Sequence, residues 1–76
     1  MYVEVYSAPW CAWCVKTKEF LQENGIDFVD KDVSNPENAR QALSVSGQSG
    51  IPVTVIDGTP VIGFDVERLR QLLRLN

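Results

Sequence analysis

The sequence has no histidine, only two cysteines and a single methionine among its 76 residues. It has no run approaching the roughly 18 apolar residues that a membrane span requires. Its seven lysines and arginines are scattered and the net charge is −3, whereas a nucleic-acid-binding protein carries a clustered basic surface. The first residues lack the basic and long apolar parts of a signal peptide. We therefore expect a cytosolic protein with neither a membrane nor a nucleic-acid partner.

The rest of the composition is that of an ordinary globular protein. Hydrophobic residues make up 45% and charged residues 22% of the chain, which is close to the average for such proteins. A length of 76 residues suits one domain. We expect a single domain over residues 1–76, and a monomer.

The first half of the chain predicts a strand, a helix and a second strand. Tyr2–Tyr6 alternates and is rich in β-forming residues, as a strand should be. Ala12–Asn24 suits a helix closed by Gly25, because glycine is favoured just past a helix end. Asp27–Val33 predicts the second strand. Thr17, Phe20, Leu21 and Asn24 recur at helical spacing and would form the inner face of that first helix.

A second helix should begin in the segment Ser34–Glu37. Either Asn35 caps it with Pro36 in the first turn, or Ser34 and Glu37 form a capping box. The expected inner face of this helix consists of Ala39, Ala42, Leu43 and Ser46.

The last third predicts a hairpin followed by a helix. Asp57-Gly58 separates the β-rich runs Val53–Ile56 and Pro60–Ile62, and such a pair favours a tight turn in which both central residues have positive φ. Asp65 can cap a final helix with an apolar stripe made of Val66, Leu69, Leu72 and Leu73. The order βαβαββα predicts an α/β fold, with a four-stranded mixed sheet and helices on both faces.

Cys11 and Cys14 lie three residues apart in the stretch SAPWCAWC. Cys11 should lie at a helix N-terminus and Cys14 one turn further in, a separation that suits a disulfide. The unpaired N–H groups and the positive dipole of a first turn favour a thiolate at Cys11. We expect Cys11 to be the exposed nucleophile and Cys14 the resolving thiol, which releases the product of the first attack.

Two other uses of the pair compete with this redox role. A structural disulfide closing so short a loop would stabilise the fold by only about 2 kcal/mol, and in the cytosol disulfides are usually catalytic or redox-sensing. A metal or iron–sulfur carrier is the stronger alternative. Its remaining ligands are not evident, because the chain has no histidine and no further cysteine. We expect no bound metal.

Three stretches together resemble the thioredoxin superfamily: APWCAWC after the first strand, GIPVTV before the hairpin and VIGFD before the last helix. The short length and the βαβαββα order are similar to glutaredoxin-like proteins, including NrdH-type redoxins. The resemblance covers essentially the whole chain. It implies a thioredoxin-like fold and a dithiol–disulfide oxidoreductase without a tightly bound cofactor.

The resemblance also implies roles for residues distant from the cysteines. Pro52, which opens a predicted strand, is similar to the family's cis-proline beside the thiol pair. The backbone of Ile51 would pair with an extended substrate segment. Gly63 would let the chain pass close to the site. Phe64 and Asp65 match positions that hold the glutamyl end of glutathione, although Asp65 is equally well explained as a plain helix cap.

At one position the sequence departs from the glutaredoxin pattern. Ala8 stands where a basic residue usually meets a glutathione carboxylate. The expected partners are therefore protein disulfides and a reductant, which is either glutathione or a flavoprotein resembling thioredoxin reductase.

Trp10 and Trp13 lie on either side of Cys11 in the sequence. If Cys11 is exposed, at most one of the two tryptophans can be buried in the first turn. We expect an apolar rim that receives protein partners. The alternative is that one of the two, Trp10 in the first place, packs onto the core.

Overall fold

The computed structural model describes residues 1–75, which form four strands and three helices. In chain order these are β1 (Val3–Ser7), α1 (Ala12–Glu23), β2 (Val29–Asp32), α2 (Pro36–Ser46), β3 (Val53–Ile56), β4 (Thr59–Ile62) and α3 (Val66–Leu73). The predicted order is confirmed. The second strand begins two residues later than expected and ends one residue earlier. Within residues 1–75 no helix combines the length and the apolar character that crossing a membrane requires.

The strands form one mixed sheet in the order β2-β1-β3-β4, with β2 parallel to β1 and the other pairs antiparallel. The predicted hairpin joins β3 to β4. Its turn residues Asp57 and Gly58 have φ values of +47° and +88°, as the Asp-Gly pair requires.

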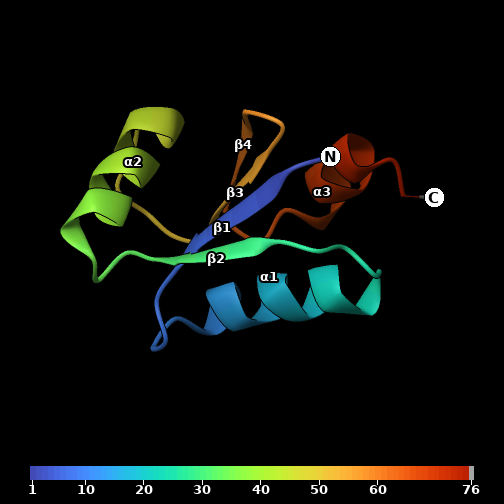
Figure 1. The fold of residues 1–76 in the computed structure, drawn as a ribbon. Helices are drawn as coiled ribbons and strands as arrows, with labels where there is room; N and C mark the ends of the chain where they lie inside the picture. The colour runs from blue at the N-terminus through green and yellow to red at the C-terminus, as the bar shows by residue number, and fades with distance from the viewer. Residues whose placement is uncertain (76) are drawn as a thin grey trace.

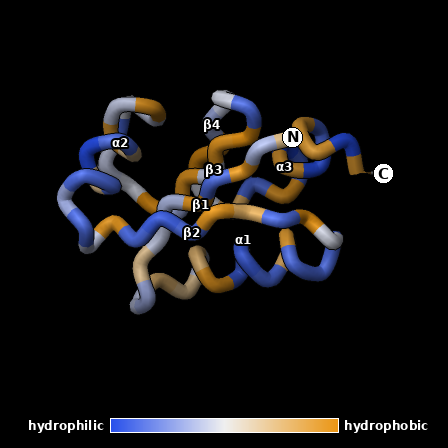
Figure 2. The backbone as a smooth tube through the Cα atoms, in the orientation of Figure 1, coloured by the Kyte–Doolittle hydropathy of each residue, from blue (hydrophilic) through white to orange (hydrophobic). Residues whose placement is uncertain are grey.

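Helices cover both faces of this sheet, and Figure 1 shows α1 and α2 on opposite sides. Alternate residues of β1 and β3 point to opposite faces, so the core has two parts. The part under α1 and α3 consists of Val3, Val5, Phe20, Leu21, Ile56, Val61, Leu69 and Leu73. The part under α2 consists of Tyr6, Ala42, Val53 and Val55. Figure 2 shows the hydrophobic colour concentrated in β3, between these two parts.

Of the two predicted starts of helix α2, the structure shows the one in which Asn35 is the cap. The Asn35 side chain accepts the N–H of Glu37 at 2.9 Å, with Pro36 in the first turn. The predicted inner face is wrong in part, because Ala42 is buried while Ala39 and Leu43 are exposed. The helix contacts the sheet through a narrow strip around Ala42, which leaves Leu43 beside a groove.

Candidate active site

The first turn of α1 is built around the Cys11 sulfur. Cys11 is the N-cap residue, and its Sγ accepts the backbone N–H of Cys14 at 3.2 Å. The N–H of Cys11 itself donates to the carbonyl of Ala8 at 3.2 Å. The sulfur therefore occupies the place of a capping oxygen, at the positive end of the helix, where a negative charge is stabilised. Cys11 is partly exposed, as expected for a nucleophile.

Cys14 lies on the inner side of the same turn and is fully buried. Its pKa is raised to about 12, first by burial and then by the hydrogen bond between its thiol and Cys11. The charge of Cys11 raises it further, whereas the Ala8 backbone and the Lys18 ammonium lower it. Both cysteines are free thiols in this structure. The accessible sulfur of Cys11 thus lies next to the buried, protonated sulfur of Cys14.

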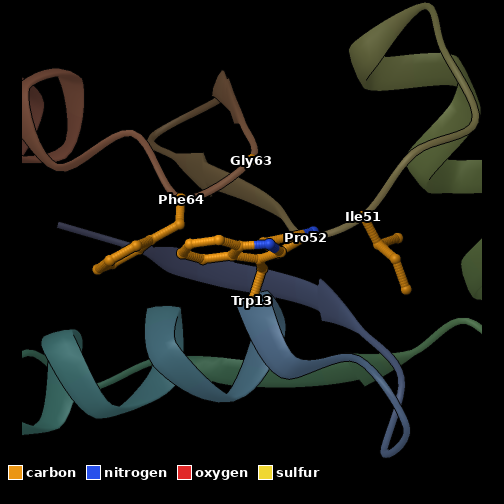
Figure 3. Close-up of a pocket in the computed structure, with 5 residues that line it drawn as sticks. All are labelled: Trp13, Ile51, Pro52, Gly63 and Phe64. Atoms are coloured by element: carbon orange, nitrogen blue, oxygen red, sulfur yellow. The ribbon is translucent and has the colours of Figure 1, made fainter.

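A first groove opens next to Trp13 of α1, on the α3 side (Figure 3). It has a volume of about 280 Å³ and is lined by Trp13, Ile51, Pro52, Gly63 and Phe64. Figure 3 shows Trp13 rising from α1 to lie beside Phe64, while Ile51 points away from both. The rings of Trp13 and Phe64 stack with centroids 6.1 Å apart, and Phe64 contacts the buried Phe20 edge-on at 6.0 Å. Trp13 is 59% exposed, yet its ring contacts the buried Phe20 indirectly, through the ring of Phe64.

The floor of this groove is the Ile51–Pro52 peptide bond, which is cis, as the family resemblance implies. The Pro52 carbonyl accepts the N–H of Gly63 at 2.8 Å, which joins the two segments. The backbone N–H and carbonyl of Ile51 form no hydrogen bond with any other group in residues 1–75. They are therefore free to pair with an extended chain.

Gly63 is one of the residues that line this groove. A Cβ at this position would meet no heavy atom within 4 Å in residues 1–75 apart from the two neighbours in the chain. The residue has φ +75°, a conformation that residues with a Cβ adopt only at a cost. The backbone conformation therefore favours glycine here, and the close passage that the resemblance implies stays a prediction.

A second groove, which was not predicted from the sequence, lies on the opposite side of Ile51. It has a volume of about 390 Å³ and is lined by Trp10, Val33, Ala39, Ala42, Leu43, Gln48, Ser49 and Ile51. Trp10 is 78% exposed, so the alternative in which it packs onto the core is wrong. The sequence signal for this groove is the helical spacing of Ala39 and Leu43, and the same spacing also predicts a stripe that faces the core.

Asp65 caps α3, and its carboxylate accepts the N–H of Arg68 at 3.1 Å. It is not among the residues that line either groove. The capping of α3 is thus sufficient to explain why residue 65 is an aspartate.

The residues that could hold a metal are few. Across residues 1–75, no group of three or more cysteine, histidine, aspartate or glutamate side chains is arranged to bind a metal ion. Ligands for a metal on the Cys11–Cys14 pair would have to come from elsewhere, because structural zinc sites use four ligands.

Comparison with known proteins points to one family. The chain matches the glutaredoxin family model over residues 3–61. It is 43% identical over 72 residues to a glutaredoxin-like 8.6 kDa protein in the rubredoxin operon of Clostridium pasteurianum, covering 93% of this chain and 96% of that protein.

Solved structures agree with this assignment. The thioredoxin-like protein BC3987 superimposes with a TM-score of 0.82 and 41% identity, covering 92% of this chain and 97% of the other. The glutaredoxin-like NrdH-redoxin from Escherichia coli, described as having a thioredoxin-like activity profile, gives a TM-score of 0.79 and 26% identity. That match covers 100% of this chain and 96% of the other.

Proposed function

Because the chain belongs to the glutaredoxin family, we propose that it is a dithiol–disulfide oxidoreductase whose substrates are disulfides in protein partners. The observation that carries this proposal is the pair of unlike sulfurs in one helical turn. Cys11 caps the helix and is partly exposed, whereas Cys14 is buried behind it with its pKa raised to about 12 by burial first of all. Such an arrangement provides a nucleophile and a separate resolving thiol.

The proposed cycle has two steps. The Cys11 thiolate attacks a target disulfide, forms a mixed disulfide and releases one target sulfur. Cys14 then loses its proton and attacks the Cys11 sulfur, which closes the Cys11–Cys14 bond and releases the second target thiol. Two electrons pass to the target, and the second step is fast because it is intramolecular.

The two grooves support a polypeptide as substrate in preference to glutathione. Both are lined mainly by apolar side chains, and no lysine or arginine lines either of them within residues 1–75. Glutathione carries two carboxylates and one ammonium, so it gains little from such walls. An extended protein segment could pair with the free backbone of Ile51 and place apolar side chains in both grooves.

For the electron donor we propose a flavoprotein reductase like thioredoxin reductase, as for NrdH-type redoxins. Ala8, where the family usually has a basic residue for glutathione, supports this choice. So does the thioredoxin-like activity profile of the Escherichia coli NrdH-redoxin. No tightly bound cofactor is part of the proposal, and the cycle suits the cytosol, where thiols are kept reduced.

Two variants test the roles of the thiols. Cys14→Ser should form a mixed disulfide with a protein target and fail to release it, which mass spectrometry of the adduct would reveal. Cys11→Ser should lose turnover by a factor on the order of 10³ or more. Undiminished disulfide reduction by Cys11→Ser would overturn the assignment.

A separate assay tests the donor. NADPH oxidation is followed with a protein disulfide substrate in two parallel reactions, one with thioredoxin reductase and one with glutathione plus its reductase. We expect turnover in the first reaction to exceed that in the second. The reverse order would identify glutathione as the donor and contradict this part of the proposal.

A further inference from the structure

A group of polar side chains joins α1 to the parallel strands β1 and β2 and is not used in the mechanism above. The hydroxyl of Ser7, itself buried, donates to Asp30 Oδ1 at 2.6 Å. The other oxygen of Asp30 forms an ion pair with Lys18 Nζ at 3.0 Å. This network, which we call the Ser7–Asp30–Lys18 chain, connects the end of β1 through β2 to α1.

Both ends of this network lie close in sequence to residues of the thiol turn. Ser7 precedes Ala8, whose carbonyl accepts the Cys11 N–H and whose backbone also forms a hydrogen bond that favours the Cys14 thiolate. Lys18 lies four residues after Cys14, and residues with this spacing share one face of a helix. Its ammonium group is partly shielded from solvent, with 23% of the side chain exposed.

The balance of forces on Cys14 changes during the reaction. In the reduced protein, burial, the hydrogen bond with Cys11 and the charge of Cys11 all oppose ionisation of Cys14. Once Cys11 is bonded to a target sulfur it carries no charge, so the last of these effects disappears. The Ala8 backbone and, more weakly, the charge of Lys18 then act against burial, and Lys18 is the charged side chain of the two.

We propose that Lys18, held in place by Asp30 and through it by Ser7, promotes the resolving step by stabilising the Cys14 thiolate. This inference rests on the proposed function, and it concerns the second step of the cycle only. In that step Cys14 gives its proton to water, its sulfur attacks Cys11, and the target leaves as a thiolate that is protonated in turn. Lys18 supplies positive charge to the attacking sulfur without exchanging a proton.

The test measures the resolving step directly. Lys18→Met and the wild type are each mixed with a protein disulfide in a single turnover, the mixture is quenched with acid, and the mixed disulfide is quantified by mass spectrometry. We expect resolution to slow by about 3- to 10-fold in the variant, the size of a partly screened charge interaction. Lys18→Arg should restore the rate, since it keeps the charge and can still bond to Asp30.

Lys16→Met is the matched control. Lys16 is exposed, lies two residues after Cys14 and so points to another face of α1. It removes the same charge from the same helix, and we expect wild-type resolution. The pH profile of the resolving rate adds a readout that a loss of packing would not move. In Lys18→Met the profile should shift to higher pH, with Asp30 and Asp32 as the other titratable groups nearby, since Cys11 is bonded to the target and does not titrate in this step.

The outcomes separate this inference from the proposed function. Equal resolving rates in Lys18→Met and the wild type would overturn the role of Lys18 while leaving the dithiol cycle intact. Equal slowing in Lys16→Met and Lys18→Met would also overturn it, because general charge would then be the cause. Absence of any mixed disulfide in the Cys14→Ser variant would instead contradict the proposed function itself.

Discussion

The two sides of α1 near its first turn carry the same amino acid, cysteine, but differ strongly in solvent exposure. On the outer side, Cys11 is partly exposed and is flanked by two exposed tryptophans. On the inner side, Cys14 and Thr17 are completely buried, and the Thr17 hydroxyl donates to the carbonyl of Trp13 at 2.9 Å. The same amino acid, placed three residues apart, is a helix cap on one side and a protonated core residue on the other.

This contrast shows how a short motif gains two chemical roles. The helix N–H of Cys14 donates a hydrogen bond to the Cys11 sulfur, while burial opposes negative charge on Cys14. The division of labour therefore depends on which side of one helical turn faces the sheet. The predictions below test that division, beginning with the largest expected effect.

Alkylation should separate the two sulfurs most strongly. The pKa of Cys14 is raised from 9.0 to about 12, chiefly by burial, so its thiolate fraction at neutral pH falls by about 12 − 9.0 = 3 orders of magnitude. In Cys11→Ser, where burial remains, we expect iodoacetamide to react with Cys14 about 10²- to 10³-fold more slowly than with a free thiol. In Cys14→Ser, Cys11 should react readily. Unfolded in urea, the two variants should be alkylated at the same rate. Comparable alkylation rates in the folded variants would contradict the predicted difference between the Cys11 and Cys14 sulfurs.

Substitution of each tryptophan should show how much each of the two grooves contributes to substrate binding. Removing an aromatic anchor from a binding surface typically costs more than 1 kcal/mol, so Trp10→Ala and Trp13→Ala should each raise KM for a protein disulfide by roughly 5- to 10-fold. Only Trp13 stacks on Phe64, so only Trp13→Ala should also lower the free energy of unfolding, by about 1 kcal/mol.

Val15→Ala is the control for this pair, since Val15 is exposed on α1 and lines neither groove. Steady-state kinetics and urea unfolding provide both measurements. An unchanged KM in Trp10→Ala would show that the groove beside α2 does not take part in binding.

The smallest expected effect is on stability at alkaline pH. A thiol whose pKa is raised on folding keeps its proton longer in the folded state than in the unfolded state. Its contribution to stability is complete below pH 9 and is lost as the pH rises toward 12. Between pH 8 and pH 10, reduced wild type should lose about 1 kcal/mol more of its free energy of unfolding than Cys14→Ala.

Urea unfolding at the two pH values checks this prediction. The pKa of Tyr6 is also raised, mainly by burial, and it adds a slope of the same sign to both proteins. The difference between the two proteins isolates Cys14, and parallel pH profiles would contradict its burial as a neutral thiol.

Much of the fold was predictable because its signals are local. The Asp57-Gly58 turn, the Asn35 cap and the apolar stripe of α3 depend on neighbouring residues, and each is confirmed. The inner face of α2 was only partly predictable. Helical spacing groups Ala39, Ala42 and Leu43 on one side, but it does not say how closely the helix approaches the sheet.

The sequence by itself determined that two thiols lie within one helical turn, since spacing and helix signals are properties of a short segment. The same local spacing placed Cys14 on the inner side of that turn, and the structure shows it fully buried. Only the tertiary structure decided that Trp10 and Trp13 line separate grooves, and that Ser7, Asp30 and Lys18 form one network. These outcomes depend on the pairing of β1 with β2 and the packing of α1 on the sheet. Contacts between segments that are distant in the chain set burial and charge proximity, and no local pattern encodes them.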